Sequence, residues 1–135
     1  MNPIVIDTDL FIDLFRQVSG AKEFFKRIEA GEFTAYCSII TVAELSSASE
    51  CASLEKLARI KTLLSMVEVV PASSETAFKA GEFRRKYGVA LPDALIAATS
   101  FFLKARIATR NNQHFSRISE ANVWVPYNPS AQKLQ

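Results

Sequence analysis

Short apolar runs alternate with longer amphipathic stretches along most of the chain. The first apolar run, Pro3–Ile6, ends at Asp7 and predicts a buried strand. In the longer stretches apolar residues recur at steps of three or four, as in Leu57, Ile60 and Leu64, which predicts helices. We predict strands over residues 3–6, 33–38, 67–70, 106–109 and 123–125, helices over residues 10–17, 19–30, 41–49, 53–66, 73–87 and 92–104, and one helical turn at residues 112–115.

The order of these elements predicts the fold class. Strands that alternate with helices favour a parallel sheet covered by helices on both faces. We therefore expect a three-layer α/β/α sandwich with a central, mostly parallel sheet. The 135 residues suit a single domain, with a core over about residues 3–126 and a short C-terminal tail over 127–135. Functional groups of such sheets gather beyond the carboxyl ends of the strands, here residues 7–9 and 109–114 and the starts of the following helices.

Composition narrows the class of protein. The chain is 49% hydrophobic and 22% charged, which is enough to fill a core and to cover it with polar residues. Its apolar runs are too short to span a membrane, and the first residues do not have the pattern of a signal peptide, so we expect a cytoplasmic protein. In a reducing cytosol Cys37 and Cys51 are expected to stay unpaired. The net charge of +2 is too small to identify a nucleic-acid binder by itself.

Acidic side chains occupy the places where a parallel sheet collects its functional groups. Asp7 and Asp9 follow the first strand, Glu44 lies in the first turns of the helix after the second strand, and Asp93 lies in the first turn of another helix. Carboxylates that converge at one sheet edge repel one another. Mg²⁺ or Mn²⁺ relieves this repulsion and, once bound, supports hydrolysis of phosphodiesters. The spacing therefore suggests a metal site.

Each acid also has a simpler structural interpretation. Asp7 or Asp9 could cap the first helix, and Thr41 and Glu44 fit a capping box. Asp93 follows Pro92 and would be favoured in a first turn by the helix dipole. Spacing alone does not decide whether these acids cap helices or bind a metal.

His114 and the basic residues are open to two interpretations as well. His114 is the only histidine, and it could bind phosphate, carry a proton or lie next to a metal. The simpler interpretation is a turn histidine packed beside Phe115. The basic run at residues 84–86 could contact phosphate, although an exposed helix face explains it more simply.

Four segments resemble, in order, the motifs of the PIN-domain family. They are IDTDLFIDLFR (6–16), SIITVAELSSA (38–48), LPDALIAATS (91–100) and IATRNNQHFSRI (107–118), and the resemblance extends over about residues 3–126. The last segment is most similar to that of VapC toxins from VapBC toxin–antitoxin pairs. The resemblance implies a PIN-like α/β/α fold and a Mg²⁺- or Mn²⁺-dependent endoribonuclease that cleaves structured RNA such as tRNA or rRNA. It also implies a homodimer, a cognate VapB-like antitoxin and contact with operator DNA only through that antitoxin.

Asp7, Glu44 and Asp93 match the family's metal-binding and catalytic acids. A fourth acid of many PIN domains is replaced here by His114, so we expect one well-bound ion and a second, if any, recruited with the substrate. Asp9 is a candidate to compensate in part. Hydrolysis in line with the leaving oxygen would give a 5′-phosphate and a 3′-hydroxyl. We expect orienting or phosphate-contacting roles for Thr8, Asp9, Thr109, Arg110 and Asn111.

Two other functions are compatible with the same sequence. The chain could be a DNA-binding regulatory module that acts with its antitoxin and has little nuclease activity. It could also be a PIN nuclease that processes ribosomal RNA. A dependence on divalent metal separates a nuclease from a pure regulator.

Overall fold

The computed structural model describes residues 2–128, and its centre is a five-stranded sheet in the order β3-β2-β1-β4-β5. All four strand pairs are parallel, and Val5 at the centre of the sheet pairs with Tyr36 on one side and Ile107 on the other. The strands are β1 (Pro3–Ile6), β2 (Thr34–Ser38), β3 (Glu68–Val70), β4 (Arg106–Ala108) and β5 (Val123–Trp124). The prediction of a central parallel sheet is confirmed.

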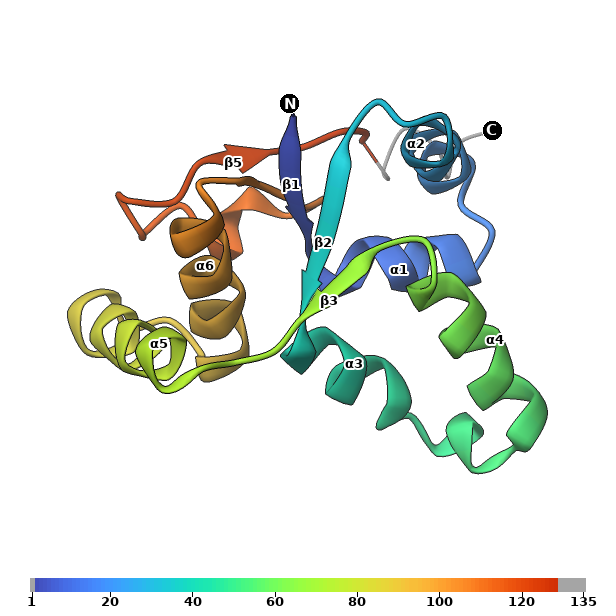
Figure 1. Ribbon diagram of the computed structural model, residues 1–135, viewed down its shortest axis with the longest axis horizontal. Coiled ribbons are helices and arrows are strands. Elements are labelled where there is room, and N and C mark those ends of the chain that lie inside the picture. Colours follow the sequence, from blue (N-terminus) through green and yellow to red (C-terminus); the bar gives the residue numbers. More distant parts are fainter. Residues whose placement is uncertain (1, 129–135) are drawn as a thin grey trace.

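Helices cover both faces of this sheet (Figure 1). The helices are α1 (Thr8–Phe15), α2 (Ser19–Glu29), α3 (Ile39–Ser46), α4 (Leu54–Leu64), α5 (Ser74–Tyr87) and α6 (Leu91–Leu103), with short 3-10 helices η1 (Ser49–Ala52) and η2 (Asn112–His114). Figure 1 shows α5 and α6 on one side of the strands and α1, α2 and α4 on the other. The predicted three-layer α/β/α arrangement is therefore also confirmed.

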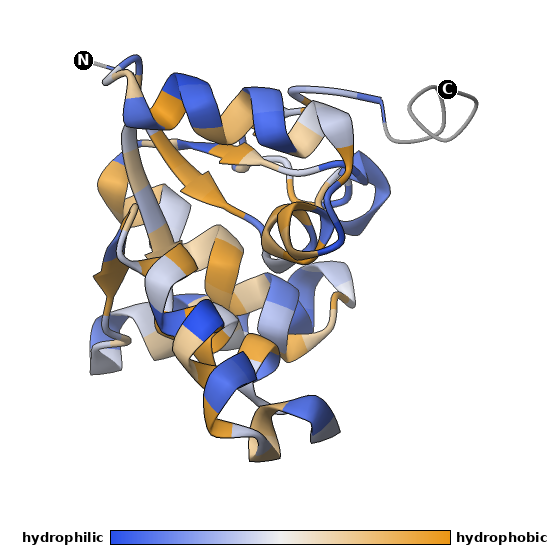
Figure 2. Cartoon of the chain, turned by 90° about the vertical axis from the view of Figure 1, so that its right-hand side faces the viewer, coloured by the Kyte–Doolittle hydropathy of each residue, from blue (hydrophilic) through white to orange (hydrophobic). Residues whose placement is uncertain are grey.

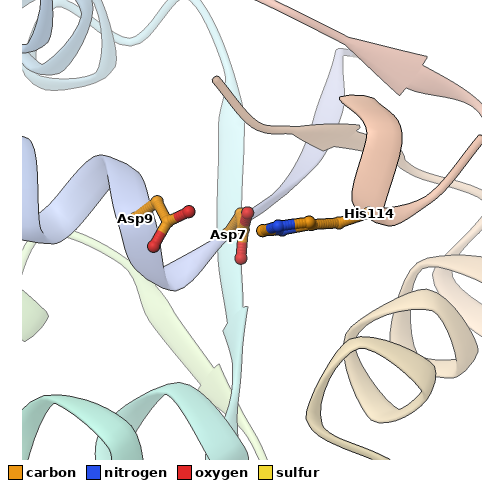
Figure 3. A group of neighbouring side chains, drawn as sticks. All are labelled: Asp7, Asp9 and His114. Carbon is orange, nitrogen blue, oxygen red and sulfur yellow. The ribbon is translucent and has the colours of Figure 1, made fainter. Parts of the chain in front are cut away.

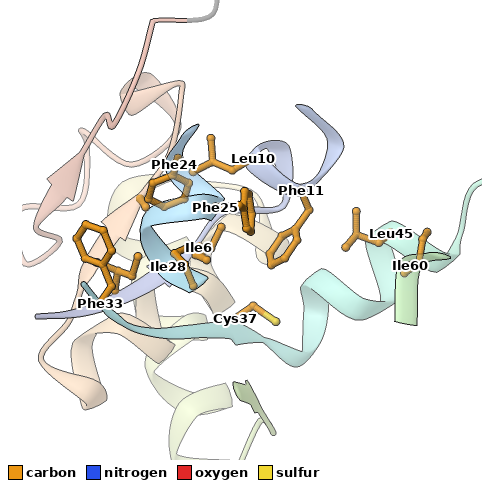
Figure 4. Packing of buried hydrophobic residues seen from close by; sticks show 12 residues of the cluster. Ile6, Leu10, Phe11, Phe24, Phe25, Ile28, Phe33, Cys37, Leu45 and Ile60 are labelled. Atoms are coloured by element: carbon orange, nitrogen blue, oxygen red, sulfur yellow. The ribbon is translucent and has the colours of Figure 1, made fainter. Parts of the chain in front are cut away.

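Alternating side chains of the central strands divide the core between the two faces. In β1, Ile4 and Ile6 join a cluster with the phenylalanines of α1 and α2, whereas Val5 joins the cluster under α5 and α6. This follows from the two-residue period of a strand, which sends successive side chains to opposite faces. Figure 4 shows the first cluster, and Figure 2 shows hydrophobic colouring on the strands and hydrophilic residues along the outer helices. Both faces of β1 are therefore buried, and the strand leads directly to Asp7 at the carboxyl edge of the sheet.

Two predicted helix starts are wrong by two residues, and those of α4, α5 and α6 by one. Helix α1 begins at Thr8 instead of residue 10, which places Asp7 at the N-cap position. Helix α3 begins at Ile39 instead of residue 41, because the side chain of Ser38 accepts a hydrogen bond from the Ile40 amide and caps the helix there. Thr41 lies inside the helix, so the capping-box interpretation of Thr41 and Glu44 is wrong.

The helix predicted over 41–49 ends at Ser46, and η1 follows it. Cys37 and Cys51 are free thiols. No helix within residues 2–128 is long and apolar enough to cross a membrane. The single-domain boundary stays a prediction, and residues 129–135 of the predicted tail lie outside the described residues.

Candidate metal-binding site

The polar residues at the carboxyl edge of the sheet line one pocket. Asp7 directly follows β1, Asp9 lies in the first turn of α1, and His114 ends η2 after strand β4. Glu44 reaches the pocket from α3 and Asp93 from the first turn of α6. The structure therefore brings together all the acids that the sequence analysis selected. The remaining lining residues are Thr8, Ile12 and Ser47.

Asp7 is the most deeply placed of these acids. It is only 3% exposed, and its Oδ2 accepts a hydrogen bond of 2.8 Å from the Thr109 hydroxyl. Although Asp7 occupies the N-cap position, its side chain makes no cap hydrogen bond. The pKa of Asp7 is raised to about 6, mainly by burial; the charges of Asp9 and Asp93 contribute to the rise, and the Thr109 hydrogen bond and His114 oppose it. The capping interpretation of Asp7 is wrong, and its carboxylate is directed to the pocket instead.

Asp7, Asp9 and His114 lie close enough together to be ligands of one ion (Figure 3). One ligand atom from each of the three lies within 4.8 Å of the others. His114 also packs beside Phe115, with ring centroids 6.3 Å apart, and its Nε2 lies 3.2 Å from Asn111 Nδ2. It is thus a turn histidine, as expected, and a member of the site as well. The sequence pointed to His114 as a site residue only through its position shortly after the end of a strand.

Asp93 and Glu44 lie at the border of this tight group. Asp93 is half-buried, and burial raises its pKa, reinforced by Glu44 and Asp9 and opposed by His114. Glu44 is exposed, and its Oε1 accepts a 2.7 Å hydrogen bond from the hydroxyl of buried Thr8. Thr8 Oγ1 is also 3.0 Å from Thr41 Oγ1. Thr8 therefore holds the carboxylate of Glu44, and Thr109 holds that of Asp7, which is the contact expected of an orienting residue.

Arg110 and Asn111 make contacts inside the protein. Arg110 Nη1 donates to Asp13 Oδ1 at 2.9 Å, and its Nε lies 3.7 Å from Asp9 Oδ2. Asn111 caps η2, with its Oδ1 accepting from the Gln113 amide. Sequence reasoning missed Asp13, which is buried and directly contacts Arg110. The basic run at residues 84–86 is exposed near the end of α5, in agreement with a solvated helix face.

The chemistry of these donors fits a divalent cation. Carboxylate oxygens suit Mg²⁺ and Mn²⁺, and an imidazole nitrogen is a softer donor that favours a transition metal over Mg²⁺. The raised pKa values of Asp7 and Asp93 reflect the cost of bringing negative charge into a partly buried pocket. The carboxylates bind a cation in their ionised form, and its positive charge would lower the cost of that ionisation.

Replacement of Asp7 by Asn is expected to stabilise the metal-free protein. The folded-state pKa of about 6 exceeds the usual 3.8, so the wild-type chain loses stability as the pH rises through this window. Above about pH 6 the penalty is fully present and amounts to about 3 kcal/mol, which Asp7→Asn would relieve while retaining an oxygen that accepts from Thr109. Thermal unfolding in EDTA should show a higher melting temperature for Asp7→Asn at about pH 7.5, with the difference shrinking toward about pH 4. Equal stability of the two proteins at neutral pH would contradict the inference that the ionised, buried Asp7 destabilises the metal-free protein.

Comparison with known proteins adds an independent finding. The family model described as PIN domain matches residues 4–121. No curated protein sequence matches the chain. A toxin–antitoxin complex from Klebsiella pneumoniae contains a chain of 29% sequence identity and TM-score 0.76, and the alignment covers 93% of this chain and 98% of that one.

Two structures of lower identity share the fold. The DNA-bound VapBC of Salmonella typhimurium has a chain of 20% identity and TM-score 0.78, with 94% of this chain and 100% of that chain covered. VapBC2 of Rickettsia felis, bound to a DNA fragment from its promoter, has a chain of 20% identity and TM-score 0.77, with 90% and 97% covered.

Proposed function

The chain belongs to the PIN-domain family, and from this membership we propose that it is the toxin of a type II toxin–antitoxin pair. In this proposal it is a Mg²⁺- or Mn²⁺-dependent endoribonuclease that cleaves structured RNA such as tRNA or rRNA. The observation that carries the proposal is the convergence of buried Asp7 with Asp9, Asp93 and Glu44 in one pocket. The similarity to a chain of the Klebsiella pneumoniae toxin–antitoxin complex supports the toxin assignment.

The residues of the pocket have distinct proposed roles. Asp7 would hold the divalent ion together with Asp93 and Glu44, and Asp9 and His114 are close enough to Asp7 to take part. Thr109 fixes the Asp7 carboxylate, and Thr8 fixes that of Glu44. When bound, the ion supplies charge stabilisation at the scissile phosphate and activates water for attack. Loss of an orienting hydroxyl, as in Thr109→Val, is a change of the kind that commonly costs about 10–100-fold in activity.

His114 gives the site an expected metal preference. Its ring nitrogen belongs to the same 4.8 Å group as the oxygens of Asp7 and Asp9, and imidazole is a better ligand for Mn²⁺ than for Mg²⁺. We expect His114→Ala to weaken Mn²⁺ binding by about tenfold and Mg²⁺ binding much less. Isothermal titration calorimetry measures both constants, and exposed Gln113→Ala is the matched control. An equal loss for the two metals would exclude direct ligation by His114.

An antitoxin is the proposed protein partner. An apolar hollow between α1, α3 and α4 is lined by Phe15, Leu45, Ala48 and Ile60, and it shares Ile12 and Glu44 with the metal pocket. Because the two hollows adjoin at these two residues, we propose that an antitoxin segment lying in the apolar one extends to the acidic site and blocks it. We also propose a homodimer, contact with operator DNA only through the antitoxin, and residence in the cytoplasm.

Filling this hollow should weaken antitoxin binding. Ala48 is exposed and lines the hollow, so Ala48→Trp is expected to raise the dissociation constant of the cognate antitoxin at least about tenfold, equivalent to ~1.4 kcal/mol. Ala52→Trp, at the other end of the 3-10 helix that Ala48 precedes and outside the lining, is the control. Surface plasmon resonance with immobilised toxin measures both. Unchanged affinity of Ala48→Trp would place the antitoxin elsewhere.

Incubation of the antitoxin-free chain with total cellular RNA tests the proposed activity. Discrete fragments with 5′-phosphate ends that form with Mg²⁺ or Mn²⁺ and are absent with EDTA would support the nuclease, and mapping of the ends would identify the RNA. Absence of cleavage by folded, metal-loaded protein would favour a regulatory module, an alternative consistent with the DNA-bound relatives. Cleavage confined to ribosomal RNA precursors would favour an RNA-processing enzyme.

A further inference from the structure

A partly buried ion pair connects the acidic pocket to the interior of the protein. Asp13 is only 2% exposed, and both of its carboxylate oxygens are engaged. Oδ1 accepts from Arg110 Nη1 at 2.9 Å, and Oδ2 accepts from the Tyr127 hydroxyl at 2.7 Å. On its other edge, Arg110 places Nε 3.7 Å from Asp9 Oδ2. One guanidinium therefore lies between a buried acid and an acid of the proposed metal site.

The positions of these residues follow from local structure. Asp9 and Asp13 are four residues apart in α1, so they project from the same face of the helix. Arg110 comes two residues after the end of β4, the neighbour of β1 in the sheet, which brings its side chain alongside that face. The planar guanidinium can engage two carboxylates through different edges, whereas the point charge of a lysine cannot hold both in the same way.

Tyr127 is held in place by a close contact with Gly20. A Cβ atom on Gly20 would lie 2.7 Å from Cδ2 of the Tyr127 ring and 2.8 Å from its Cγ, so only glycine allows the ring to pack there. The ring packs against the hydrophobic cluster under α1 and α2, while its hydroxyl reaches Asp13. Asp13 is thus held from one side by Tyr127 and in turn holds Arg110.

We propose that Arg110 is a positioning residue of the metal site. It fixes the carboxylate of Asp9 beside Asp7 and His114, and Asp13 and Tyr127 fix Arg110. This inference rests on the proposed function only in that it requires a divalent ion at Asp7. In this role Arg110 acts inside the protein and does not contact RNA phosphate. Tyr127, in the segment after β5, then influences metal binding through Asp13 and Arg110.

A double-mutant cycle on Mn²⁺ binding tests this proposal without any RNA. Arg110→Lys keeps the charge and loses the bridge, and it is expected to weaken Mn²⁺ binding about tenfold in calorimetry. If Arg110 acts through Asp9, that loss disappears in the Asp9→Asn background, because the group to be positioned is gone. Exposed Arg117→Lys is the matched control and should leave the constant unchanged.

Tyr127→Phe provides a second, milder variant that retains the packing on Gly20 and removes only the hydroxyl. It is expected to weaken Mn²⁺ binding about threefold, again only when Asp9 is present. Additive losses in the cycle, or an unchanged constant in both folded variants, would overturn the inference, as would absence of Mn²⁺ binding by the wild-type chain. The predicted coupling without RNA cleavage would retain the inference and reject the nuclease proposal.

Discussion

Asp7→Asn is expected to abolish metal-dependent RNA cleavage while leaving the fold intact. The substitution removes the charge of the most buried acid in the pocket but keeps an oxygen to accept from Thr109. A bound ion contributes several kcal/mol to stabilisation of the transition state, so its loss should reduce cleavage by about a thousandfold or more. Quantitative cleavage of a mapped RNA, with Mn²⁺ binding measured in parallel, provides the test.

The controls for this variant separate chemistry from folding. Because metal-free Asp7→Asn should be more stable than the wild-type protein at neutral pH, loss of activity cannot be ascribed to unfolding. Glu23→Gln, which neutralises an exposed acid on α2, should cleave at the wild-type rate. If Asp7→Asn retained wild-type turnover, Asp7 would not be a metal ligand, and the pocket would need a different function.

Phe83→Ala is expected to cause the largest loss of stability among single changes on helix α5. Phe83 is 1% exposed and packs against the rings of Tyr87 and Phe101, with centroids 6.1 and 6.3 Å away. Truncation of a buried phenylalanine removes apolar burial and leaves a cavity, which together cost about 3–5 kcal/mol. Since α5 packs on α6, which carries Asp93, metal affinity should also fall in this variant. Urea denaturation measures the free energy of unfolding.

Phe78→Ala is the matched control for this prediction. Phe78 lies on the same helix but is 82% exposed, so its truncation should change the free energy of unfolding by no more than about 0.5 kcal/mol. Equal losses for Phe78→Ala and Phe83→Ala would show that α5 does not bury the face assigned to it here. A destabilised Phe83→Ala with a wild-type Phe78→Ala is the expected pair of results.

Hydrophobic periodicity predicted the strands and helices well because both faces of the sheet are buried. Ile4 and Ile6 face one layer and Val5 the other, so the strand had to be a continuous apolar run. The predicted starts of α1 and α3 were each two residues late, and only that of α3 is set by a side-chain cap. Ser38 ends β2 and caps α3 directly, a connection without a loop that apolar spacing does not reveal.

The site was predictable from strand order only for residues that closely follow a strand in the sequence. The rule that functional groups follow parallel strands led to Asp7 and Glu44, whereas Asp93 follows helix α5 and was selected as a first-turn acid and by the motif it belongs to; all three line the pocket. Asp13 and Tyr127 could not be found in this way, because they are 114 positions apart and meet only through packing of the segment after β5. His114 was visible in the sequence, but its direction toward Asp7 depends on the short helix that carries it.

The central claim is that a divalent ion bound at the acidic edge of the sheet enables RNA cleavage. Its most direct test is a Mn²⁺ titration of the metal-stripped wild-type chain, with RNA cleavage and calorimetric binding measured under the same conditions. We predict that cleavage reaches half its maximum at the concentration that half-fills the site. Undiminished cleavage in EDTA, or saturation by Mn²⁺ with no cleavage of cellular RNA, would contradict this claim.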